Sequence, residues 1–86
     1  MKLNKDFIKR TKDGVALVVP TAEAGFHGVV HGNSTVAVIL ELLENDITLD
    51  GIVDAMCERY EGDPAVIRED VEDVVTKLKG IGAIDE

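Results

Sequence analysis

The segment from Ser34 to Glu44 constrains the fold most strongly, because apolar residues cover almost every side of the helix that it predicts. Asn33 and Ser34 stand at its start, and their side-chain oxygens can accept hydrogen bonds from the free amides of a first helical turn. A helix on the protein surface would show a polar side, which this segment lacks. We therefore predict a central helix over residues 34–44 that neighbours bury on several sides, entered from a strand that ends near His31.

The chain has 86 residues, and only three of them are aromatic (two Phe and one Tyr). A single small domain of this size buries roughly 60 to 65% of the surface that its unfolded chain exposes, so we expect a modest core of Val, Ile and Leu. The single Cys57 excludes an internal disulfide. No apolar run is long enough to span a bilayer, and a cytoplasmic protein is the simplest interpretation.

Charge is distributed unevenly along the chain. Residues 1–13 carry five basic and two acidic side chains, whereas residues 41–86 carry fourteen acidic and four basic ones. The acidic part would repel nucleic-acid phosphates, so we expect no nucleic-acid partner. It suits a basic peptide or a basic patch on a partner protein. A role in solubility alone stays open as the other explanation of these acids.

The N-terminal part predicts three strands. We expect residues 1–5 to be frayed. Residues 7–11 and 15–19 are β-rich and flank Asp13-Gly14, a pair that is typical of tight hairpin turns. After a loop of small residues, Phe26 to His31 predicts a third strand that leads into the central helix.

The C-terminal half predicts two further helices and a short tail. Thr48 is a good N-cap for a second helix that ends at Gly62. Asp63 and Pro64 mark the start of a third helix, and Gly80 is expected to end it in the left-handed conformation. Residues 81–84 then return to the core as a short extended segment. The predicted fold class is α+β: a small, winged-helix-like domain with an N-terminal three-stranded sheet followed by three helices.

Little in the sequence points to catalysis. It contains no Gly-rich phosphate loop and no paired cysteines, and we expect no catalytic residue, no metal and no cofactor. One alternative is an acyl or peptidyl carrier protein that receives a phosphopantetheine arm on Ser34. Asn33 and Thr35 flank that serine in place of the aspartate and leucine of the usual carrier signature. A winged helix could also bind DNA, but acidic residues along the third helix argue against docking in the major groove.

A further possibility uses the backbone as the binding group. If the predicted third strand lies at an open sheet edge, its free amides and carbonyls can receive an extended peptide as an added strand. The third helix would then supply the other wall of the site. A different part of the fold, or a dimer partner, could cover this edge instead.

Several spaced motifs make the chain similar to the PqqD family, small proteins named for the biosynthesis of pyrroloquinoline quinone. The resemblance extends over residues 7–85 and is carried by the apolar strand into an Asn-led helix and by the later helices. The motifs are Val29-Val30-His31-Gly32-Asn33-Ser34-Thr35-Val36-Ala37, Ile39-Leu40-Glu41-Leu42-Leu43, the helix start at Thr48, Glu58-Arg59-Tyr60, and Asp70-Val71 through Leu78 to Gly82-Ala83-Ile84.

The resemblance implies a peptide chaperone that is not an enzyme. Such a domain binds the leader segment of a ribosomally made precursor peptide and presents it to a modifying enzyme, often a radical S-adenosylmethionine protein. The leader adds to the third strand and packs against the third helix. Carried over, the peptide-binding residues of this chain are Gly28, Val29, Val30, His31, Arg68, Val71, Glu72 and Val75.

Two questions stay open within that resemblance. Which flank of the third helix faces the peptide is not decided by the sequence, and a homodimer through the open strand is an alternative use of the same edge. The family usually has Leu before the helix-leading Asn, where this chain has Gly32. This departure leaves the peptide, the modifying enzyme and the final product open.

Overall fold

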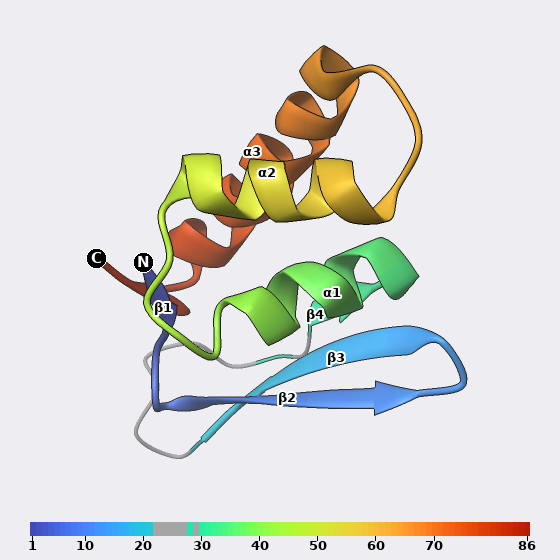
Figure 1. Ribbon diagram of the computed structural model, residues 1–86. Helices are drawn as coiled ribbons and strands as arrows, with labels where there is room; N and C mark the ends of the chain where they lie inside the picture. The colour runs from blue at the N-terminus through green and yellow to red at the C-terminus, as the bar shows by residue number, and fades with distance from the viewer. Residues whose placement is uncertain (22–27, 29) are drawn as a thin grey trace.

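The computed structural model describes residues 1–21, 28 and 30–86. Their element order is β1 (Lys2–Leu3), β2 (Phe7–Lys12), β3 (Val15–Pro20), β4 (Val30–Gly32), α1 (Ser34–Leu42), α2 (Leu49–Arg59), α3 (Pro64–Gly80) and β5 (Ile84–Asp85). Strands β2, β3 and β4 form one antiparallel sheet, and three helices follow it, as Figure 1 shows. The small α+β domain predicted from the sequence is confirmed.

The hairpin between β2 and β3 turns at the predicted Asp-Gly pair. Asp13 has a φ of 53° and Gly14 a φ of 78°, so both turn residues adopt the left-handed backbone that a two-residue hairpin loop requires. The turn sets the register, in which Lys12 pairs with Val15 and Phe7 pairs with Pro20. Because side chains alternate between the faces of a strand, Phe7, Ala16 and Val18 share the buried face of the sheet.

The residue just before each of α1, α2 and α3 accepts a hydrogen bond with its side chain from an amide of the first turn. Asn33 accepts from the amide of Val36 at 3.1 Å, Thr48 from Gly51 at 3.0 Å, and Asp63 from Ala65 at 2.9 Å. These contacts satisfy amides that have no partner within the helix. The predicted helix starts are therefore confirmed, with Asn33 rather than Ser34 as the cap of α1.

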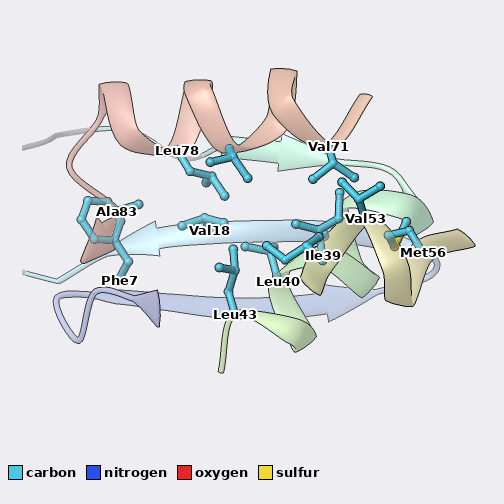
Figure 2. Packing of buried hydrophobic residues seen from close by; sticks show 13 residues of the cluster. Phe7, Val18, Ile39, Leu40, Leu43, Val53, Met56, Val71, Leu78 and Ala83 are labelled. Atoms are coloured by element: carbon cyan, nitrogen blue, oxygen red, sulfur yellow. The ribbon is translucent and has the colours of Figure 1, made fainter. Parts of the chain in front are cut away.

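An aliphatic core joins the sheet to the helices. Figure 2 shows Val18 from β3, Ile39 and Leu40 from α1, and Val71 and Leu78 from α3 gathered in one cluster. Ile39, Leu40 and Leu43 are fully buried, and the remaining apolar side chains of α1 are partly buried, as its uniform hydrophobicity predicts. No helix in the described part of the chain is long and apolar enough to cross a membrane.

The two ends of the chain differ from the prediction of a frayed N-terminus. Lys2 and Leu3 pair with Asp85 and Ile84 in a two-stranded sheet, and the amide of Leu3 donates to the carbonyl of Leu43 at 2.9 Å. The C-terminal return onto the core was predicted, and it supplies the edge that orders residues 2–3. Composition alone does not reveal such a pairing, because its partner is more than eighty positions away.

The end of α3 also differs from the prediction. Gly80 is the last helical residue, and the glycine with a left-handed backbone is Gly82, whose φ is 78°. The amide of Gly82 donates to Lys79 and the amide of Ala83 donates to Leu78, so the chain turns two residues later than expected. This turn places Ala83 in the core.

Candidate functional site

Strand β4 forms one edge of the three-stranded sheet. Val30, His31 and Gly32 pair with Val18, Leu17 and Ala16 of β3, and the described residues place no strand on the other side of β4. In an antiparallel pair, successive residues direct their amide and carbonyl groups alternately toward the partner strand and away from it. Part of the β4 backbone therefore faces outward, where an added strand could bond to it.

A groove lies between this edge and α3. Its volume is about 440 Å³, and the residues that line it come from β4, the start of α1 and one flank of α3: His31, Gly32, Asn33, Thr35, Val36, Asp70, Asp73, Val74 and Lys77. A smaller hollow of about 90 Å³, mostly apolar, lies where Val36, Val74 and Leu78 approach His31. Figure 2 shows α3 running past β4 on the side away from β3. The groove thus has a strand edge as one wall and a helix flank as the other.

Gly32 shapes the floor of the groove. A Cβ atom added to Gly32 would lie 2.5 Å from Cβ of Val36, which is far inside van der Waals contact. The first turn of α1 therefore packs against bare backbone at this position. The leucine expected here from the resemblance would collide with Val36. The glycine at position 32 is therefore consistent with the close approach of Val36.

The groove flank of α3 mixes acidic, apolar and basic groups. Nζ of Lys77 forms an ion pair with Oδ2 of Asp73 at 3.1 Å, and both side chains are largely exposed. Val74 is partly buried against the core, and Asp70 has no salt bridge to another described residue. This flank offers a peptide one apolar contact and at least one free carboxylate.

The four predicted residues of α3 lie elsewhere. Val71 and Val75 are 1% and 5% exposed and belong to the core, so their side chains do not reach the groove. Arg68 and Glu72 lie on the opposite flank, where Nη2 of Arg68 donates to Oδ1 of Asp50 on α2 at 2.6 Å. The Asp50 carboxylate raises the pKa of Arg68 above its ordinary value. Arg68 is therefore engaged with α2, and neither Arg68 nor Glu72 lines the groove beside β4.

The predicted residues of the strand are only partly described. His31 is exposed and lines the groove, and Val30 belongs to β4. Gly28 is exposed, with a φ of 143° that side-chain-bearing residues rarely adopt. Val29 lies outside the described residues, as do Phe26 and His27 of the predicted third strand.

The α3 residues that line the groove differ from the four predicted ones. Asp70, Asp73, Val74 and Lys77 recur at spacings of three and four, which places them on one helix face. That stripe lies directly beside the buried stripe of Val71, Val75 and Leu78. The spacing was available in the sequence, but it does not say which neighbouring element the stripe faces.

The position of Ser34, the residue of the alternative carrier hypothesis, is explained by the start of α1. Ser34 is exposed at the first position of α1, and Asn33 before it caps the helix. Ser34 does not line the groove or the hollow beside it. The described surface around Ser34 therefore adds nothing in favour of a carrier protein.

Comparison with known protein families identifies the family of this chain. The family model described as "Coenzyme PQQ synthesis protein D (PqqD)" matches residues 17–84. The chain belongs to the PqqD family. The matched segment contains β4, all three helices and every residue that lines the groove. No curated protein matches the sequence significantly.

Two solved structures share the PqqD-like fold of this chain. One is described as TbiB1 in complex with the TbiA(beta) leader peptide; it is 22% identical with a TM-score of 0.76, and the alignment covers 99% of this chain and 100% of that one. The other is described as lasso peptide synthetase B1 complexed with the leader peptide, at 18% identity and a TM-score of 0.75, covering 95% of this chain and 93% of that one.

Proposed function

We propose that this PqqD-family domain is a non-catalytic peptide chaperone, which binds the leader segment of a ribosomally made precursor peptide and presents it to a modifying enzyme. The observation that carries the proposal is the outward-facing edge of β4 beside a groove along α3. Family membership and two fold relatives described with bound leader peptides support it. In this proposal the leader adds as a strand to β4, and its side chains fill the groove.

The two edges of the sheet differ in a way that favours β4. The opposite edge strand, β2, carries Lys9, Arg10 and Lys12 among its six residues, and charged side chains of this kind discourage pairing with another chain. Strand β4 carries no Lys, Arg, Asp or Glu in its three residues. Strand addition is therefore opposed on one edge and permitted on the other.

The proposed peptide-binding residues combine the predicted strand with the groove flank of α3. On the strand side they are Gly28, Val29, Val30 and His31, which contribute mainly backbone groups. On the helix side we choose Asp70, Asp73, Val74 and Lys77, because these four line the groove and the predicted Arg68, Val71, Glu72 and Val75 do not.

Strand pairing alone gives weak binding. Each backbone hydrogen bond adds a net of about 0.5–1.5 kcal/mol, and β4 has only three residues. Association itself costs about 4–15 kcal/mol in lost freedom. Burial of peptide side chains in the groove must supply most of the remainder, at about 25 cal/mol per Å² of apolar surface.

Family membership supports an enzyme partner that receives the peptide. A radical S-adenosylmethionine protein, or another enzyme that modifies peptides, is the proposed partner. The domain itself would contribute no catalytic group, metal or cofactor. A homodimer paired through β4 is the competing use of the same edge, since it would occupy the groove that the leader needs.

Capture of a peptide from the native cell lysate, followed by a binding test, examines this proposal. The full chain is used to isolate short peptides, which are identified by mass spectrometry and then synthesised. We expect amide hydrogen exchange at Val30, His31 or Gly32 to slow when the synthetic peptide binds, because strand addition protects outward-facing amides. We also expect Val30→Pro, which removes a donor and fixes the backbone, to weaken binding.

A matched control separates loss of binding from loss of folding. The protein is left unchanged, and single backbone amides of the peptide are N-methylated instead. N-methylation at alternate positions of the paired segment should weaken binding at least about tenfold, since each removed donor leaves an unpaired group in the complex. Full-strength binding by every N-methylated peptide, or by a folded Val30→Pro variant, would contradict strand addition.

A further inference from the structure

A second cavity, of about 240 Å³, opens where the start of α1, the end of α2 and the start of α3 meet. Its walls are mainly apolar and include Met56, Tyr60, Val66, Ile67 and Val71. Pockets that hold a drug-sized molecule measure about 300–1,000 Å³, so this cavity matches a single side chain better than a whole small molecule.

Two of its wall residues are unusually exposed for their size. Tyr60 is 37% exposed and Val66 is 54% exposed, and the other large hydrophobic residues of the described chain that are this exposed, Ile8 and Val15, lie on the hairpin. Exposed apolar side chains that line a concave site are typical of a surface that buries itself against a ligand.

The cavity continues the groove beside β4. Thr35 and Asp70 line both of them, so the two form one trough along α3, from Lys77 at one end to Val66 at the other. The three residues of β4 extend over only roughly 10 Å. A peptide paired with β4 that continues in the direction of α1 therefore passes over the cavity.

The charged residues that line the cavity are all acidic, which favours a ligand with a positive charge. Glu61, Asp63 and Asp70 surround it, and no Lys, Arg or His is among the residues that line it. Asp63 caps α3, whereas neither Glu61 nor Asp70 has a salt bridge to another described residue. A cationic group beside the cavity would be attracted by these carboxylates.

We propose that this cavity is an anchor subsite for the peptide. It takes an apolar side chain of a peptide that has a lysine or arginine close to that apolar residue. The proposal rests on the function proposed above, because it is continuity with the β4 groove that brings a peptide there. The apolar side chain packs against Val66, Ile67 and Tyr60, and the cation lies against Asp70 or Glu61. The subsite predicts a sequence pattern in the leader, namely an apolar residue close to a basic one.

A random-peptide selection tests this pattern without knowledge of the native leader. Linear peptides from an mRNA-displayed library are selected on the full chain, and the selected sequences are compared. We expect them to share an apolar residue with a nearby lysine or arginine. Replacing that basic residue with glutamine in a selected peptide should weaken binding about two- to fivefold, as for an ion pair exposed to solvent.

Two variants of the protein provide the direct comparison. Val66→Glu places a charge on the wall of the cavity and should weaken the selected peptides at least about tenfold, because the complex would bury that charge among apolar groups. Ala65→Glu adds the same charge to the neighbouring exposed position, outside the cavity, and should change binding less than about twofold. Both sites are exposed, so both variants are expected to fold.

The outcomes separate this inference from the function on which it rests. If Val66→Glu and Ala65→Glu bind equally well while binding still protects the β4 amides, the anchor subsite is wrong and strand addition stands. If selected peptides leave the β4 amides unprotected and tolerate Val66→Glu, both ideas are wrong. A selection that yields no binding peptide overturns both as well.

Discussion

The two flanks of α3 are built from similar residues but have different neighbours. On one flank Arg68 is held between Asp50 of α2 and Glu72 of its own helix, with nitrogen–oxygen distances of 2.6 and 3.8 Å. On the other flank Asp70, Asp73, Val74 and Lys77 face the β4 edge across a groove. In Figure 1, α2 packs beside α3, which accounts for the first flank.

This difference shows that acidic composition does not by itself mark a binding surface. The Arg68 flank is balanced by an ion pair between helices, so its charges serve the fold. The Asp70 flank lines the groove beside β4, and the described residues place no strand on the far side of β4, so the charges and the valine of this flank are open to a ligand. The position of α2, rather than the residue types, distinguishes the surroundings of the two flanks.

The largest effect is expected from a substitution at Gly32, which lies where β4 meets α1 at the floor of the groove. Gly32→Ala places a methyl group 2.5 Å from Val36, so the start of α1 must shift. We expect the free energy of unfolding to fall by about 1–3 kcal/mol, the usual effect of overpacking. Denaturant unfolding measures it. Gly80→Ala is the matched control: a Cβ there meets nothing within 4 Å, and stability should hold or rise. Equal stability of both variants would mean that Gly32 does not shape the groove.

A charge placed on either side of α3 tests whether only one flank binds peptide. Val74→Glu puts a carboxylate at the apolar contact of the groove and should weaken leader binding at least about tenfold. Thr76→Glu adds the same charge at an exposed position of α3 that does not line the groove, and should change binding less than about twofold. Fluorescence anisotropy with a labelled peptide measures both. Equal loss in the two variants would show that net charge, and not the groove, controls binding.

The smallest expected effect separates the carboxylates of the two flanks. Asp70→Asn and Glu72→Gln each remove one negative charge, so long-range attraction changes equally in both. We expect Asp70→Asn to weaken a basic peptide about two- to fivefold more than Glu72→Gln does. The difference should shrink in high salt, since the Debye length falls from about 10 Å at 0.1 M to about 3 Å at 1 M. Titrations at two ionic strengths measure this, and a salt-independent difference would contradict an electrostatic origin.

Local features of the fold could be predicted because their causes are close in sequence. The turn at Asp13-Gly14 and the helix caps at Thr48 and Asp63 each depend on residues within three positions, and the structure confirms them. The N-terminal pairing of β1 with β5 was missed, because its hydrogen bonds join opposite ends of the chain. The late turn at Gly82 was missed because two nearby glycines suit the same conformation.

The candidate site was predictable only in part. The open strand edge followed from the order of the elements and from a resemblance to the PqqD family, and the sheet order places β4 at an edge. The residues of α3 that line the groove did not follow from the sequence. Val71, Val74, Val75 and Leu78 all suit an apolar stripe, but Val74 lines the groove while the other three are buried.

The sequence by itself determined a buried aliphatic α1, a hairpin, three capped helices and the presence of a strand leading into α1. Only the tertiary structure decided which side of α3 is core and which side faces β4. Neighbouring residues on a helix point about 100° apart, so a rotation of α3 by that angle would place Val75 where Val74 now lies. The orientation of α3 is set by its simultaneous packing against α2, β5 and the shared core, contacts that no local pattern contains.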